Sequence, residues 1–171
     1  MGIGTDFQMH FTHKLEKMFI LSIVAALGYL GYSMYQSYTF KHSPLSVAIQ
    51  ERVHKKEAEV LALIEQKFKL KTDIPLIISD EFNSNLYGLT SYKDAQIAVY
   101  LNKKRFRESV DYMIDEVIPH EYAHAMVFMM GARMSEDGHT KLWQKICLEL
   151  GGRQCERYVD SEEIVRQKMG L

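Results

Sequence analysis

Pro119-His120-Glu121-Tyr122-Ala123-His124 is the stretch on which the interpretation of the whole chain depends. His120 and His124 are four residues apart, so on a helix they lie one turn apart on the same face and both imidazoles can reach one metal ion. Glu121 lies between them, where its carboxylate can contact a water on that ion without binding the metal itself. This H-E-x-x-H spacing predicts a zinc hydrolase. Because it arises by chance in roughly 2% of chains of this composition, the surrounding sequence has to support it.

A catalytic zinc site usually has three protein ligands and a water, so a third ligand is needed. His139 is the favoured candidate, because it follows a polar turn at 133–138 and precedes an apolar helical pattern. The carboxylates of Glu149, Glu136 and Asp137 are the alternatives, since two histidines and one carboxylate also form catalytic sites.

The sequence also bears on the class of metallopeptidase and on the residue that would stabilise the oxyanion. The extended metzincin pattern is excluded, because Val127 and Met130 stand where it requires glycine and a third histidine. An additional donor to the oxyanion is expected, and Tyr122 and Tyr158 are candidates that no residue pattern singles out.

The composition is that of one globular domain with an appendage: 171 residues, 47% hydrophobic and 25% charged. A net charge of −1 provides no basic excess that would favour nucleic acid as a partner. Cys147 and Cys155 fit neither a disulfide framework nor a Cys-x-x-Cys metal site. The base rates for cysteine burial predict two free thiols, one in the core and one partly exposed.

Residues 18–40 contain no charged side chain and follow a short polar tail at 1–17. A membrane-spanning helix needs about 20 residues and carries interfacial aromatics where it leaves the lipid, as tyrosines 29, 32, 35 and 38 would here. The stretch therefore predicts an uncleaved anchor in a lipid bilayer. A signal peptide is the main alternative, although no small-x-small cleavage site follows, and a buried helix is the other.

The positive charges around this stretch give a slight preference for its orientation. Lys14 and Lys17 precede it, whereas four basic residues follow it within about 20 positions: Lys41, Arg52, Lys55 and Lys56. The count favours the cytoplasmic side for the C-terminal domain, and this preference is weakened if Arg52 to Lys56 belong to a folded helix.

Residues 41–171 are expected to form an α+β domain. Ser43 and Pro44 are placed to cap and open an amphipathic helix over 45–69. Three short runs rich in Ile, Val, Leu and Tyr predict a small antiparallel sheet with strands at 75–79, 86–92 and 96–102, the last two joined by a turn at 92–96.

A helical pattern returns from Arg105 and leads into the motif. Pro119 either kinks this helix or marks the start of the motif helix, since proline removes a backbone donor but is tolerated in a first turn. Gly131 is a plausible stop for that helix.

The segment Asp115 to His124, with its proline before the first histidine, resembles the active-site helix of the SprT-like metallopeptidases, which have a minigluzincin-like catalytic core. Gly138-His139-Thr140-Lys141-Leu142-Trp143 is similar to their third-ligand segment, in which an aromatic follows the histidine by four positions. Gly151 and the hairpin that ends in Ile97 to Asn102 also fit, and the resemblance covers roughly residues 45–158.

The resemblance implies zinc held by His120, His124 and His139, with Glu121 as the catalytic acid and base, a small antiparallel sheet on the motif helix, and a peptide or protein substrate. The zinc ribbon and DNA-binding regions of some members have no counterpart in this sequence, so a DNA-repair role is not carried over. A non-catalytic zinc-binding or structural domain and a hydrolase of non-peptide substrates are the rival hypotheses.

Overall fold

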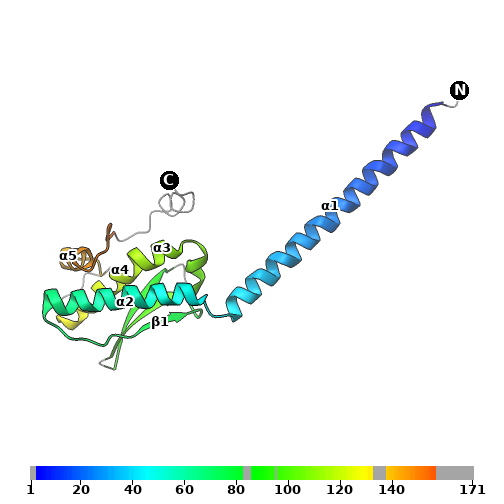
Figure 1. Ribbon diagram of the computed structural model, residues 1–171. Helices are drawn as coiled ribbons and strands as arrows, with labels where there is room; N and C mark the ends of the chain where they lie inside the picture. The colour runs from blue at the N-terminus through cyan, green and yellow to red at the C-terminus, as the bar shows by residue number, and fades with distance from the viewer. Residues whose placement is uncertain (1–2, 83–85, 95, 133–137, 157–171) are drawn as a thin grey trace. The chain divides into compact units, whose positions relative to one another are not determined.

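The computed structural model describes residues 3–82, 86–94, 96–132 and 138–156, and it divides into two compact units, 1–44 and 45–171 (Figure 1). The first unit is the helix α1 (Ile3–His42), which begins well before the expected span at 18–40. It ends where Pro44 disfavours helical backbone at the preceding residue. The part from Lys14 to His42 is long and apolar enough to cross a membrane, a test that a signal sequence near the N-terminus also passes.

The second unit begins with α2 (Val47–Phe68), an amphipathic helix. Its cap is Ser46, whose side chain accepts a hydrogen bond from the Ile49 amide, so the expected cap at Ser43 was wrong. Pro44 lies before the helix and does not open it, so Ser46 is the serine whose hydroxyl lies next to the first turn. Val53, Val60 and Ile64 form the buried stripe, at the seven- and four-residue intervals of one helix face.

The sheet contains β1 (Leu76–Ser79), β2 (Gly88–Lys93) and β3 (Gln96–Asn102), in the order β1-β3-β2. β2 and β3 form the expected antiparallel hairpin, whereas β1 pairs with β3 in parallel, so the all-antiparallel sheet was a wrong expectation. The hairpin reverses the chain between β2 and β3, and β1 joins the far edge of β3 instead of pairing with β2. The α+β class is confirmed.

After β3 the chain turns through η1 (Lys103–Arg107), α3 (Val110–Tyr112) and the wider π-helical turn η2 (Met113–Val117) into α4 (Ile118–Met129). Pro119 explains the wide turn, because it cannot donate to the carbonyl four residues earlier and its ring would collide with it. Proline therefore stands in the first turn of the motif helix, and Gly131, at φ +62°, follows the end of that helix as expected.

α4 is the central element of this unit, since it packs against α2, against β2 and β3, and against α5 (Lys141–Glu149). Its residues from Ile118 to Val127 are almost all buried. α5 begins at Thr140, whose side chain accepts a hydrogen bond from the Trp143 amide. After α4 the chain thus turns back, and the amphipathic helix α5 packs against the motif helix.

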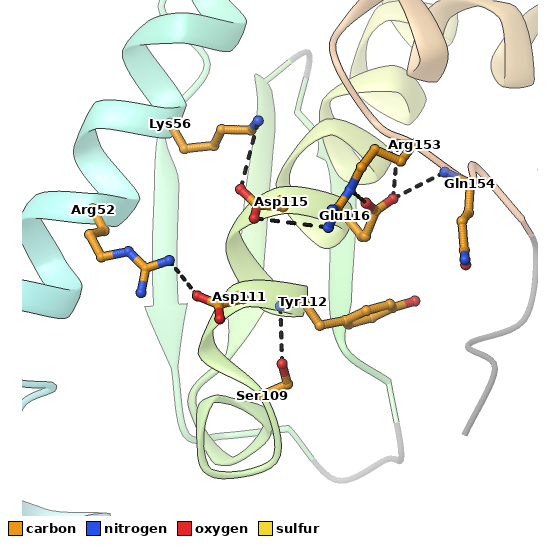
Figure 2. A network of polar contacts seen from close by, with 9 residues as sticks. All are labelled: Arg52, Lys56, Ser109, Asp111, Tyr112, Asp115, Glu116, Arg153 and Gln154. Carbon is orange, nitrogen blue, oxygen red and sulfur yellow. Dashed lines mark hydrogen bonds and ion pairs between the residues drawn. The ribbon is translucent and has the colours of Figure 1, made fainter. Parts of the chain in front are cut away.

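The turn that leads into α4 is fixed by the carboxylate of Glu116 (Figure 2). Glu116 is 6% exposed and accepts hydrogen bonds from Arg153 Nε at 2.6 Å, from the Arg153 amide at 3.0 Å and from the Gln154 amide at 3.2 Å. The neighbouring Asp115 lies 4.0 Å from Lys56 Nζ on α2. These contacts tie α2 and the segment after α5 to the start of the motif helix.

Cys147 and Cys155 form a disulfide, so the expectation of two free thiols was wrong. The bond closes a loop that reverses direction through Gly151, at φ +90°. A Cβ at Gly152 would lie 2.7 Å from one sulfur and 2.8 Å from the other, so glycine is needed there for space. The closed loop presents the donors that hold Glu116.

Glu116→Gln should lower the free energy of unfolding of the full chain by about 1–3 kcal/mol, because a buried carboxylate with three donors loses its charge. Denaturant titration in detergent measures this change. Glu149→Gln is the matched control. Within the described residues the Glu149 carboxylate makes a 4.0 Å pair with the exposed Lys145, so its substitution should cost a few tenths of a kcal/mol. Equal effects of the two substitutions would contradict the role of Glu116.

Candidate metal centre

The structure brings His120, His124 and His139 together at one point. Their Nε2 atoms form a nearly equilateral triangle, with sides of 3.3 Å between His120 and His124, 3.3 Å between His124 and His139, and 3.2 Å between His139 and His120. The first two histidines come from successive turns of α4, and His139 comes from the segment that precedes α5. These are the three residues among those described that could together hold a metal ion.

This triangle has the dimensions that a tetrahedral ion requires. Nitrogen ligands about 2.0–2.1 Å from zinc at tetrahedral angles lie about 3.3–3.4 Å from one another. A neutral imidazole has one N–H and one lone pair, so three such nitrogens facing each other at this distance need a proton or a cation between them. The residues therefore fit a metal ion of the size and preference of zinc.

The ring of Trp143 packs against all three histidine rings. It is 1% exposed, and its ring centroid lies 4.6 Å from that of His120, 5.2 Å from that of His124 and 4.5 Å from that of His139. Its indole Nε1 donates to the main-chain oxygen of His120 at 3.3 Å. One side chain of α5 thus contacts all three rings and the helix that carries two of them.

Burial keeps the histidines of α4 neutral. It lowers the pKa of His120 from 6.5 to about 3, with a further contribution from the other two rings. Burial, followed by the proximity of His139, lowers the pKa of His124 to about 4. Neutral imidazole is the form that binds a metal, so at neutral pH these two rings need not release a proton to do so.

Glu121 is 6% exposed and points toward the sheet, where Thr90 Oγ1 lies 2.9 Å from its Oε2 and 2.7 Å from its main-chain oxygen. Burial raises the pKa of the Glu121 carboxyl from 4.5 to about 7, and the two contacts with Thr90 oppose this rise. A carboxyl with a pKa near 7 can both accept and return a proton at physiological pH.

The structure distinguishes among the alternatives that the sequence left open. Glu149 is not part of the histidine cluster and lies on α5 beside Lys145. Tyr122 is fully buried, and its hydroxyl donates to the main-chain oxygen of Ile74 at 2.9 Å and contacts Glu57 at 3.2 Å, so it faces away from the cluster. Glu136, Asp137 and Tyr158 lie outside the described residues.

Two residues that contact Glu121 were not anticipated from the sequence. They are Thr90 and Gly88 on β2, whose strand faces the motif helix. A glycine inside a strand often marks a close approach of another group, so Gly88 was a signal that the sequence contained. Nothing in the sequence indicated that the approaching group would be Glu121.

A pocket open to solvent borders the histidine cluster. Its lining includes His139, Trp143 and Lys141 near the start of α5, together with Cys155 and Glu156. The side of the cluster formed by His139 is therefore accessible from solvent.

Comparisons with known proteins agree with this geometry. Protein SprT of Serratia proteamaculans (strain 568) is 29% identical over 99 residues, which are 58% of this chain and 56% of that protein. The chain thus spans little more than half the length of this curated relative, and no solved structure matches it. The model of the SprT-like family matches residues 57–163, which contain the sheet, the motif helix and all three histidines. The chain belongs to the SprT-like family.

Proposed function

We propose that the protein is a membrane-anchored zinc metallopeptidase, in which His120, His124 and His139 bind the metal and Glu121 is the general base. The observation that supports this most strongly is the triangle of Nε2 atoms, 3.2–3.3 Å on each side. A structural zinc site is normally closed by four protein ligands, whereas a catalytic site keeps one position open. The described cluster offers three ligands beside a solvent-open pocket, which favours catalysis over a structural role.

When bound, zinc lowers the pKa of its water and polarises the carbonyl of the substrate. The residues of the chain do the rest. Glu121 accepts the proton of the attacking water and returns it to the leaving amine, which its raised pKa allows at neutral pH. The apolar residues of α4 and Trp143 cover part of the histidine cluster, and the pocket beside His139 leaves one side open to solvent. A peptide or protein is the proposed substrate, and nucleic acid is not expected to be a partner.

Glu121→Gln should keep zinc bound and lower peptide hydrolysis by about 10²–10⁴-fold, because it removes the proton acceptor but no ligand. His139→Ala should lose zinc, and His54→Ala, which changes an exposed histidine on α2, should alter neither zinc content nor activity. Metal analysis and hydrolysis of quenched-fluorescent peptides measure both properties. Full activity in Glu121→Gln would exclude the assignment, and zinc retained in His139→Ala would exclude the third ligand.

The stability of the metal-free protein should fall on acidification. Between about pH 5 and 6 the unfolded chain binds nearly two protons on His120 and His124 that the fold excludes, because their folded pKa values are about 3 and 4. The fold holds one proton on Glu121 that the unfolded chain mostly releases, since burial raises that pKa to about 7. The unfolded state thus binds about one proton more on these groups, and their contribution to stability falls by about 1 kcal/mol for each unit that the pH decreases.

Glu121→Gln removes the opposing proton, so the loss per pH unit should be about twice as large. Denaturant titration with chelator at several pH values between 5 and 6 measures both slopes. The difference between the slopes isolates Glu121, because every other group titrates in both proteins. Identical slopes would show that Glu121 does not hold a proton in the metal-free fold.

We also propose that the catalytic domain lies on an oxidising side of the membrane. The disulfide between Cys147 and Cys155 would be reduced in most cytosols, whereas secretory and periplasmic compartments preserve such bonds. The charge count favours the opposite side, but two of its residues belong to the fold. Arg52 lies 2.5 Å from Asp111 and Lys56 lies 4.0 Å from Asp115, so both are paired within the domain.

The redox state of the two cysteines in intact cells tests this orientation. After acid quenching, the full chain is labelled with a maleimide under denaturing conditions, with and without a reductant, because both cysteines are buried in the fold. Both cysteines of the wild-type protein should label only after reduction. Cys147→Ser is the control, because it leaves Cys155 without its partner, so that Cys155 should label without a reductant. Labelling of both wild-type thiols without a reductant would place the domain in a reducing compartment.

A further inference from the structure

Gly88 and Thr90 lie on one face of β2, two residues apart, and both meet the side chain of Glu121. An ideal Cβ at Gly88 would be 2.7 Å from the Cγ and 2.7 Å from the Oε1 of Glu121. Gly88 does not have the left-handed backbone that favours glycine. The reason for a glycine here is therefore the room that the Glu121 side chain needs. The glutamate therefore occupies a volume that any other residue at 88 would fill.

Thr90 contacts the same glutamate at two atoms. Its Oγ1 is 2.7 Å from the main-chain oxygen of Glu121 and 2.9 Å from Oε2. In the part of the chain that the structure describes, Thr90 provides the hydrogen bond to this carboxyl. Because the hydroxyl is held by the helix backbone, its oxygen stands at a fixed point beside the carboxyl, whichever of the two atoms receives its proton.

A general base has to stand within hydrogen-bond reach of the proton that it accepts, and displacement of a catalytic group by about 1 Å costs on the order of 100-fold in rate. Glutamate has three rotatable side-chain bonds, and burial alone does not select one arrangement. The space left by the missing side chain of Gly88 accommodates one carboxylate oxygen, and the hydroxyl of Thr90 is placed to hydrogen-bond the other, so together they favour one arrangement.

We propose that Gly88 and Thr90 are positioning residues that hold the Glu121 carboxyl in one orientation. The inference rests on the proposed function, in which Glu121 is the general base. It assigns to β2 a role beyond completing the sheet, since alternate residues of one strand shape and anchor the base. The competing explanation is that Thr90 only ties β2 to α4 through the main-chain oxygen of Glu121.

Kinetics of the full chain in detergent with zinc, on a quenched-fluorescent peptide, separate these explanations. Thr90→Val keeps the shape and removes the hydroxyl, so kcat should fall about 10-fold or more while KM stays within about twofold. Thr90→Ser keeps the hydroxyl and should retain kcat within about threefold. Ser91→Ala is the matched control, because Ser91 lies on the opposite face of the same strand. Gly88→Ala should lower kcat by forcing the carboxyl aside.

Crystal structures of the metal-free proteins give a readout that is independent of activity. The Glu121 carboxyl should keep its place beside residue 90 in the wild-type protein and in Thr90→Ser, and should rotate away or split into several conformers in Thr90→Val and Gly88→Ala. A fixed carboxyl in both of the latter variants, or a kcat of Thr90→Ser as low as that of Thr90→Val, would overturn the proposal. If the zinc-bound wild-type protein cleaves no peptide, the proposed function fails, and these structures still decide whether the two residues hold Glu121.

Discussion

The convergence of three imidazoles on one point is the constraint on which the rest of the domain depends. Nε2 atoms 3.2–3.3 Å apart require that α4 and the segment carrying His139 keep fixed positions relative to each other. α4 is therefore enclosed by the sheet, α2 and α5, and Trp143 joins α5 to the backbone of His120. Many of the buried apolar residues of the domain lie on α4 itself, from Ile118 to Val127. Stability and site geometry consequently depend on the same contacts.

The approach to α4 shows how local chemistry produces this geometry. Pro119 prevents the usual hydrogen bond to the residue four positions earlier, and the backbone responds with the wide turn η2. Glu116 lies within this wide turn, and its polar side chain is buried near the core. The loop closed by the disulfide supplies its donors. A segment after α5 thereby determines how the motif helix begins.

Features with a local pattern could be predicted from the sequence. The i, i+4 spacing of His120 and His124, the stop at Gly131 and the β2–β3 hairpin needed no information from distant residues. Pairings between distant residues could not be predicted. Thr90 and Glu121 are 31 positions apart and meet only because β2 crosses α4. The parallel pairing of β1 with β3 depends on the edge of the hairpin that β1 joins. The helix cap is Ser46 and not Ser43, because both serines precede the helix and the sequence alone does not show which of them lies next to its first turn.

Glu116 and Glu121 show how one residue type acquires two roles within five positions of the same helical run. Glu116 is held by three donors, one of them a guanidinium, so its negative charge is satisfied and its position is structural. Glu121 has a single hydroxyl at its carboxyl, within an apolar wall that raises its pKa to about 7. Three donors hold a carboxylate in one place, whereas burial beside a single hydroxyl favours the protonated form of Glu121. The difference in surroundings, more than the residue type, therefore suits Glu121 to its proposed role as the base and Glu116 to a structural role.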